Sequence, residues 1–376
     1  MTSAARPRRA GLGAAHATLL AEFDARRPAA LARVVSIVEN RRAGFEALLA
    51  ALHPKLGRAW RIGLTGPPGA GKSTLTNRLT HDYRAAGRTV GIIAVDPTSP
   101  FTGGALLGDR IRMESVALDP GVFIRSMATR GSLGGLAAAT REVADVYDAF
   151  GIDVILIETV GVGQSELDIA RTADTSIVVL VPESGDSIQT LKAGLMEIAD
   201  LYVVNKADRP GADRLRNELE LMLGLRAGNS MRDMPAHHGI DLRRVATPEE
   251  RRAQNPARVA RALARDEEAA TWTPPVLATV AAEGKGVSKV VDGIDRHRRF
   301  LERTGELRVR RARRLRERVI EVAERMMRGR LWGDEATREA LEGALPALES
   351  GATSPFEVAE TLLANAAAVV GGNTGR

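Results

Sequence analysis

The sequence feature that most constrains this chain is a glycine-rich loop between a short aliphatic strand and a helix. Residues 66–73 read GPPGAGKS and match the phosphate-binding pattern GxxxxGK[ST] in full. The pattern predicts a strand at residues 62–64 and a helix over residues 74–83. Glycines let successive backbone N–H groups turn inward, and the positive end of the helix faces the same anion. The loop therefore predicts a site for nucleotide phosphates in an α/β fold.

Positions within this loop have specific expected tasks. Lys72 is expected to reach the β- and γ-phosphates, and the hydroxyl of Ser73 to bind Mg²⁺. The residues expected to contact the nucleotide here are Gly66, Pro67, Pro68, Gly69, Ala70, Gly71, Lys72, Ser73 and Thr74. A chance glycine-rich turn is the alternative, but it does not account for the strand before the loop and the helix after it.

Short aliphatic strands, mostly separated by helical stretches, recur along most of the chain. They are predicted at residues 62–64, 90–95, 154–157, 177–181, 201–204 and 276–280. Such alternation predicts a mainly parallel sheet wrapped by helices. The expected fold class is α/β, a P-loop NTPase with additional helices at both ends.

The same pattern suggests a division of the chain into segments. We expect a disordered extension at 1–26, N-terminal helices at 27–59, a P-loop domain at 60–291 and a C-terminal helical region at 292–376. Within the P-loop domain, residues 226–269 are richer in charge and interrupted by proline, so we interpret them as an insertion.

The C-terminal region carries the basic character of the chain. The formal net charge is +6, and residues 296–330 contain 14 Arg, no Lys and 5 acidic residues. An apolar stripe runs through the same stretch, at Leu315, Val319, Val322 and Met326. The stripe and the interleaved Glu residues favour a paired helix with a solvated basic face over nucleic-acid binding.

The choice of base depends on Asn205-Lys206-Ala207-Asp208, which follows a predicted strand. Ligand loops of open α/β sheets gather at the carboxyl ends of strands. Guanine presents N1–H and its 2-amino group side by side, so the Asp208 carboxylate accepts from both, whereas adenine leaves it unpaired. Asn205 is expected to brace the loop and bond the base edge, and the Lys206 stem to cover the purine. The pattern favours GTP over ATP.

Two acidic residues close predicted strands and suggest a magnesium site. Asp96 follows residues 90–95, and Glu158 follows residues 154–157. One of them is expected to bind Mg²⁺ directly or through water, and the other to orient a water molecule. Gly161 lies three residues after Glu158, where a backbone N–H can sense the γ-phosphate. For either acid alone, capping of the next helix is the alternative.

Several runs together resemble one known family. The runs are GLTGPPGAGKST, AVDPTSP, GALLGDRIRM, IETVGVGQSE, GDSIQTLKAG and NKAD. They resemble the MeaB/ArgK family of P-loop GTPases, G-protein chaperones of adenosylcobalamin-dependent methylmalonyl-CoA mutase and its relatives. The resemblance covers residues 28–225 and 270–330 and implies GTP hydrolysis, a mutase partner and a homodimer built through the C-terminal helices.

The family resemblance also implies roles for individual residues. Asp96, Asp109 and Glu158 are expected to serve Mg²⁺ or the switch loops. Residues 185–194 are expected to form a further mobile loop that controls hydrolysis in the mutase complex. We expect the partner to move Lys192 or Gln189 of this loop toward the phosphates, which makes Lys192 a candidate catalytic residue.

Two departures from the family pattern concern the base and the insertion. Many GTPases carry Ser-Ala in the loop that contacts the base, whereas the matching residues here are Ala281 and Ala282. The Ala282 backbone N–H is still expected to meet guanine O6, so a side-chain brace is what the loop lacks. Residues 226–269 do not match the family pattern, and we expect this insertion to choose a particular mutase.

Other functional classes fit the composition less well. A P-loop small-molecule kinase remains an alternative, although such kinases rarely need Asn-Lys-x-Asp. A nickel-type metallochaperone GTPase is weakened because the chain has no Cys and only six His. The absence of Cys indicates a reducing compartment, cytoplasmic or, in a eukaryote, the mitochondrial matrix. Aliphatic runs of four or five residues are far shorter than the ~20 that span a bilayer, so no membrane segment is expected.

Overall fold

The computed structural model describes residues 13–96, 113–128, 135–159, 169, 171–182, 197–226 and 271–365. The chain divides into two compact units, Met1–Leu307 and Arg308–Arg376. The first unit contains the phosphate-binding loop, and the secondary structure in the described part of the second unit consists of helices.

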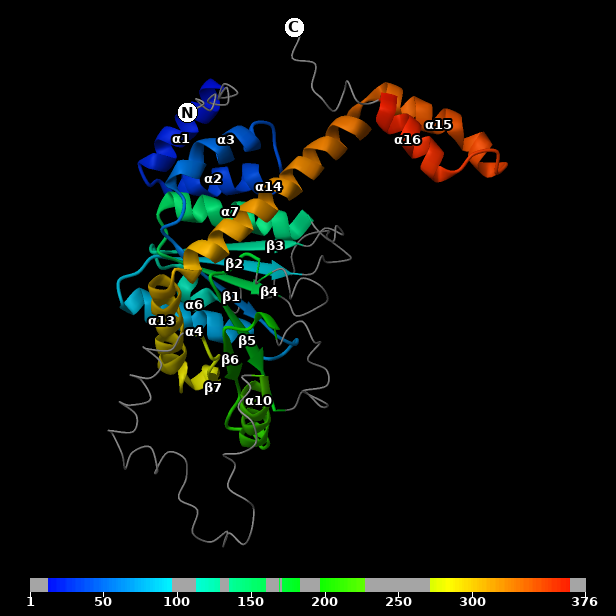
Figure 1. Ribbon diagram of the computed structural model, residues 1–376. Helices are drawn as coiled ribbons and strands as arrows, with labels where there is room; N and C mark the ends of the chain where they lie inside the picture. Colours follow the sequence, from blue (N-terminus) through cyan, green and yellow to red (C-terminus); the bar gives the residue numbers. More distant parts are fainter. Residues whose placement is uncertain are drawn as a thin grey trace, which may run out of the picture. The chain divides into compact units, whose positions relative to one another are not determined.

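A parallel sheet forms the centre of the first unit (Figure 1). In chain order the strands are β1 Trp60–Thr65, β2 Val90–Asp96, β3 Val122–Ala128, β4 Val154–Thr159, β5 Thr175–Leu180, β6 Leu201–Val204 and β7 Val276–Ala278. Their spatial order is β3-β2-β4-β1-β5-β6-β7, and each neighbouring pair is parallel. All residues of β4, β5 and β6 are buried, as expected for strands covered on both faces. The carboxyl ends of all these strands therefore meet at one edge of the sheet.

Helices cover both faces of this sheet (Figure 1). Those of the P-loop unit are α4 Lys72–Ala85, α6 Glu114–Ala117, α7 Gly135–Phe150, α10 Ala212–Arg226 and α13 Val287–Thr304. Leu156 of β4 packs in one apolar cluster with residues of α4 and α13, whereas its neighbours Ile155 and Ile157 pack in another with residues of α7. Successive side chains of a strand point to opposite faces, so these clusters are the two layers of the core.

Three N-terminal helices extend the layer formed by α7. They are α1 Ala14–Asp24, α2 Pro28–Glu39 and α3 Phe45–Leu52, followed by the short 3₁₀ helix η1 His53–Lys55. The expected disordered extension up to residue 26 does not hold for residues 14–24, because these form α1. Leu19 and Phe23 lie four residues apart on one face of α1 and are buried. The Phe23 ring meets Phe150 of α7 edge-on, with ring centroids 5.0 Å apart.

The ends of β1, β2, β4 and β5 differ from the sequence prediction by one or two residues, and further differences concern β3 and β7. β3 was not expected, because Arg125 and Ser126 interrupt its apolar run. It lies at the edge of the sheet, where the Arg125 Nε donates to Glu39 Oε2 of α2 at 2.6 Å. β7 ends at Ala278, and Val280 instead forms an isolated antiparallel bridge with Lys285.

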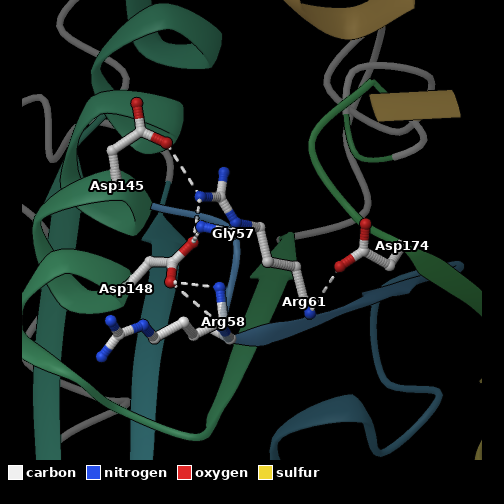
Figure 2. Close-up of polar contacts among 7 residues, drawn as sticks. Gly57, Arg58, Arg61, Asp145, Asp148 and Asp174 are labelled. Carbon is white, nitrogen blue, oxygen red and sulfur yellow. Dashed lines mark hydrogen bonds and ion pairs between the residues drawn. The ribbon is translucent and has the colours of Figure 1, made fainter. Parts of the chain in front are cut away.

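The start of β1 is held by a carboxylate of α7 (Figure 2). Asp148 is buried, and it accepts hydrogen bonds from the backbone N–H groups of residues 57–59 at 2.8–3.0 Å. The Arg61 guanidinium donates to Asp148 at 3.2 Å and to Asp145 at 2.8 Å. The backbone N–H of Arg61 donates to Asp174 at 3.2 Å. These contacts fix the start of β1, the strand that leads into residues 66–73, relative to α7 and to Asp174.

The second unit contains α14 Glu306–Gly333, except its first two residues, together with α15 Glu335–Glu349 and α16 Pro355–Asn365. Asp334 caps α15 by accepting from the Thr337 N–H at 3.0 Å and from its hydroxyl at 2.8 Å. No residue of α14 is buried, and Val319 is 68% exposed. Among the described helices, none is long and apolar enough to cross a membrane.

Candidate nucleotide-binding site

The loop of residues 66–73, which we call the P-loop, joins β1 to α4 and depends on two glycines. Gly66 has φ +134°, and a Cβ there would lie 2.1 Å from the Val179 carbonyl oxygen. Gly71 has φ +85°, and a Cβ there would lie 2.3 Å from the Asn205 Nδ2 atom. Larger residues are excluded at both positions by the positive φ and by the close approach of neighbouring atoms.

The Lys72 ammonium group lies inside the P-loop. The residue is 6% exposed, and its Nζ donates to the carbonyl oxygens of Gly66 at 2.8 Å and of Pro67 at 3.0 Å. Lys72 is also the first residue of α4, so the positive charge and the positive end of the helix are at the same place. This arrangement provides a cationic cradle for an anion.

Two hydroxyl groups of α4 bind the carboxylate of Glu158. Ser73 Oγ donates to Glu158 Oε1 at 2.6 Å, and Thr76 Oγ1 donates to Glu158 Oε2 at 3.2 Å. Glu158 is 4% exposed and lies on β4 opposite Leu64 of β1, in register with the end of the central strand. Sequence reasoning missed Thr76, although it lies one helical turn after Ser73 on the same face.

The oxygen atoms at this position are of the kind that Mg²⁺ prefers. A serine hydroxyl and a carboxylate are hard oxygen ligands, and a Mg²⁺ site needs few protein ligands because the ion keeps several waters. Asp96 is the last residue of β2, next to β4, and so belongs to the same edge of the sheet. Among the described residues there is no group of three or more His, Asp or Glu side chains that could hold a metal ion. Of the predicted Mg²⁺ ligands, Ser73 and Glu158 are the two whose side chains the structure describes.

Asn205, directly after β6, connects three loops. Its Nδ2 donates to the Ala70 carbonyl oxygen of the P-loop at 2.8 Å. Its Oδ1 accepts from the Thr279 hydroxyl at 3.1 Å and from the Ala281 N–H at 3.0 Å. The residue is 3% exposed, so these bonds replace water that the amide lost on burial. The predicted bracing role of Asn205 stays a prediction, but its described contacts suit it.

The rest of the Asn-Lys-x-Asp sequence turns outward from the sheet edge. Lys206 has φ +55°, and Asp208 is exposed. The Ala207 N–H donates to the Thr279 carbonyl at 3.0 Å, which ties this turn to the strand end of β7. A hydrogen bond to Glu283 raises the pKa of Lys285, and Asp208 raises it further through its charge.

The predicted base-contacting residues Ala281 and Ala282 lie in a 3₁₀ helix, η3 Ala281–Glu283, after β7. Ala281 is buried and Ala282 is exposed. Since β6 and β7 are adjacent, η3 and the turn at Lys206 and Asp208 emerge from neighbouring strand ends. The structure thus brings the P-loop, the Asn205 turn and η3 together.

Three predicted site residues lie outside the described residues: Asp109, Gly161 and Lys192. The same is true of the predicted loop at 185–194 and most of the predicted insertion at 226–269. The side chain of Asp96 is likewise not described, although its place at the end of β2 is.

Comparison with known proteins agrees with this geometry. The sequence profile of the family described as methylmalonyl Co-A mutase-associated GTPase MeaB matches residues 31–336. A Pyrococcus abyssi protein named as a GTPase is 44% identical over 336 residues, which are 89% of this chain and 91% of that protein. The GTPase ArgK of Escherichia coli is 45% identical over 184 residues, 48% of this chain and 56% of ArgK.

Structural similarity extends over nearly the whole chain. The crystal structure of an LAO/AO transport system kinase has a TM-score of 0.61 and 26% identity, and covers 94% of this chain and 98% of that one. A P-loop that matches the full pattern, a parallel sheet with helices on both faces, and a family match over most of the length lead to one conclusion. The chain belongs to the MeaB family of P-loop GTPases.

Proposed function

We propose that this GTPase is a magnesium-dependent molecular switch that acts as a chaperone of an adenosylcobalamin-dependent acyl-CoA mutase, gating cofactor loading and protecting the mutase. The observation that carries the nucleotide part is the position of Asn205, whose amide bonds the P-loop and the loop of Ala281 together. The mutase part is supported by the description of the matched family, which names methylmalonyl Co-A mutase.

In this proposal the phosphates of GTP lie against the backbone N–H groups of the P-loop. Lys72 exchanges its bonds to the Gly66 and Pro67 carbonyls for bonds to β- and γ-phosphate oxygens. The guanine edge meets the Asp208 carboxylate and the Ala282 N–H, while the Lys206 stem covers the ring. Asp208 is exposed without nucleotide, and a bound base would cover its carboxylate; because guanine can satisfy that carboxylate and adenine cannot, GTP is selected over ATP.

Ser73 and Glu158, together with Asp96 and Asp109, are proposed to hold Mg²⁺. When bound, Mg²⁺ would neutralise phosphate charge. Glu158 already holds the Ser73 and Thr76 hydroxyls, so its carboxylate orients the first turn of α4. Lys72 then stabilises the charge that develops on the transferred phosphoryl group.

The switching part of the proposal involves a partner protein. Gly161 senses the γ-phosphate, and Lys192 is moved toward the phosphates when the mutase orders its loop. An enzyme whose catalytic groups are not yet assembled is slow alone, and a partner that assembles them supplies the missing stabilisation of the transition state. The exposed stripe on α14 is proposed as the homodimer interface.

The test compares turnover of GTP and ATP by the full chain, with and without a purified adenosylcobalamin-dependent mutase. GTP should be hydrolysed, ATP should not compete, and the mutase should raise the GTPase rate. Lys72→Ala should lower the rate by at least about 100-fold, because the phosphoryl charge loses its main stabilising cation. If the chain used ATP as well as GTP, or transferred phosphate to a small molecule, the proposal of a GTPase switch would be wrong and a kinase function would take its place.

A lysine pair tests the partner-dependent step. Lys192→Ala should lose the stimulation by the mutase. The control is Lys55→Ala, because Lys55 lies in η1 before β1, at the amino edge of the sheet, and pairs with Asp24. Equal stimulation of both variants would remove the role of Lys192, and no stimulation of the wild type by such mutases would remove the chaperone role.

A further inference from the structure

The loop that carries the proposed contact to guanine O6 has few side chains that could brace it from within. Its residues 281–284 are Ala-Ala-Glu-Gly, which we call the base loop. The Glu283 carboxylate forms an ion pair with Lys285, with 2.6 Å between Oε2 and Nζ. Asn205 holds the Ala281 N–H, but Ala282 is exposed. Backbone hydrogen bonds of η3 hold part of this loop, because the Glu283 N–H donates to the Val280 carbonyl at 3.0 Å and the Gly284 N–H to the Ala281 carbonyl at 3.2 Å. Further support from outside the loop would fix the direction of the Ala282 N–H.

An arginine of the P-loop helix supplies that support. Arg78 of α4 donates from Nε to the Ala281 carbonyl at 3.1 Å and from Nη2 to the Ala282 carbonyl at 2.6 Å. The two acceptors belong to consecutive residues, and the planar guanidinium group contacts both at once. Hydrogen bonds from a charged donor are shorter and stronger than neutral ones.

We propose that Arg78 is a positioning residue for guanine recognition. It does not touch the base; it fixes the two carbonyls that flank the Ala282 peptide nitrogen, and so fixes the direction of that N–H. The inference rests on the proposed contact between the Ala282 N–H and guanine O6. It adds a residue that lies outside every motif of the sequence and 203 positions from Ala281.

The arrangement also links phosphate binding to base recognition. α4 begins at Lys72 in the P-loop, and Arg78 lies less than two turns further along the same helix. A rigid helix therefore sets the distance between the phosphate cradle and the base loop. A side-chain brace from within the base loop, which Ala281 lacks, would not create this link.

The experiment measures affinity of the full chain for four nucleotides in the presence of Mg²⁺: GTP, 6-thio-GTP, ITP and ATP. Sulfur is a weaker acceptor than oxygen, so the GTP to 6-thio-GTP ratio reports the contact to O6. ITP lacks the 2-amino group, so the GTP to ITP ratio reports the contact to Asp208. These two ratios separate the base loop from the rest of the site.

Arg78→Ala should weaken GTP binding about fivefold, the effect of one lost hydrogen bond of ordinary strength. The GTP to 6-thio-GTP ratio should fall by a similar factor, and the GTP to ITP ratio should not change. Arg78→Lys keeps the charge but not the two-armed contact, so it should give an intermediate result.

The matched control is Arg84→Ala. Arg84 lies on the same helix, but it binds Asp119 at 2.9 Å and the Arg88 carbonyl at 2.8 Å. The Arg84→Ala variant should bind all four nucleotides with the affinity of the wild type. Hydrogen exchange of the base loop without nucleotide gives a second readout, and Arg78→Ala should speed exchange there while Arg84→Ala should not.

The possible failures are distinguishable. If the wild type binds ATP as tightly as GTP, the proposed guanine site itself is wrong. If the wild type prefers GTP but Arg78→Ala retains the wild-type GTP to 6-thio-GTP ratio, only the role of Arg78 is wrong. A uniform loss for all four nucleotides would show that Arg78 acts on the fold of α4, which would also overturn the proposal.

Discussion

The side-chain amide of Asn205 donates a hydrogen bond to the backbone carbonyl of Ala70, with a distance of 2.8 Å between nitrogen and oxygen. The two residues are 135 positions apart, and one follows β6 while the other lies in the P-loop. Through the Oδ1 of the same amide, the P-loop is also connected to Thr279 and Ala281. One buried side chain thus connects the proposed phosphate and base subsites.

Replacement of this amide tests that connection. Asn205→Ala should leave the buried Ala281 N–H and the Ala70 carbonyl without their partner, at a cost of about 2–4 kcal/mol in the free energy of unfolding. GTP affinity should fall more than the stability change explains, since both subsites lose their common support. Urea unfolding and nucleotide titration measure the two effects. Asn77→Ala is the control, because Asn77 is bonded to Ser115 near the surface and should change neither.

Asp208 tests the choice of base. Asp208→Asn should weaken GTP binding and strengthen binding of xanthosine triphosphate, because the amide presents a donor where xanthine carries an acceptor at O2. Competition binding with both nucleotides gives the change in preference. Asp213→Asn, at the exposed start of α10, should bind both as the wild type does. If the preference of Asp208→Asn does not move, Asp208 does not contact the base.

Glu158 tests the proposed magnesium site. Glu158→Gln should raise the Mg²⁺ concentration for half-maximal GTPase activity, because an amide oxygen is a weaker ligand than a carboxylate. Ser73→Ala should shift the Mg²⁺ dependence in the same direction. Thr76→Val removes a hydroxyl that bonds Glu158 at the longer distance of 3.2 Å, so its shift should be smaller. The same Mg²⁺ dependence in Glu158→Gln and wild type would contradict the assignment.

Asp148 is expected to stabilise the fold rather than to act in the site. Asp148→Ala leaves the N–H groups of residues 57–59 without their acceptor, so the free energy of unfolding should fall by about 3 kcal/mol or more. Asp148→Asn keeps one acceptor oxygen and should lose less. Asp24→Ala, which removes an exposed partner of Lys55, should stay within about 0.5 kcal/mol of wild type. Urea unfolding of the three variants decides the order.

The exposed stripe of α14 predicts self-association. Leu315, Val319 and Met326 are exposed, and a second copy of the chain would cover them. Light scattering should show a dimer, and Val319→Asp combined with Val322→Asp should give a monomer. Arg313→Asp changes charge on the opposite face of the helix and should remain dimeric. A monomeric wild type at micromolar concentration would contradict the proposed interface.

Local sequence was sufficient for the phosphate loop and for the class of fold. Gly66 and Gly71 sit at positive φ, a property that the glycines themselves allow, so the loop pattern could be read without knowledge of its surroundings. Continuous apolar runs of four or five residues marked β4, β5 and β6 to within two residues at each end, because strands of a buried parallel sheet are covered on both faces. The Asn-Lys-x-Asp sequence directly follows the apolar run of β6, so its place at the carboxyl end of that strand could also be predicted.

The parts that sequence reasoning missed depend on neighbours from elsewhere in the chain. β3 lies at the sheet edge and contains Arg125, whose charge is compensated by Glu39 of α2. α1 is anchored by Leu19 and Phe23, but Leu20 and four alanines are spread around the same helix, so its apolar residues do not form a one-sided stripe.

The sequence by itself determined the local backbone geometry, the polarity of each segment and the identity of the groups that could bind a nucleotide. Only the tertiary structure decided which of them meet. The order β3-β2-β4-β1-β5-β6-β7 places Glu158 beside Ser73, and it places Asn205 between Ala70 and Ala281. Arg78 reaches the base loop across 203 residues because α4 packs beside η3. Such contacts are set by strand order and helix packing, which depend on burial across the whole core and leave no pattern at a single position.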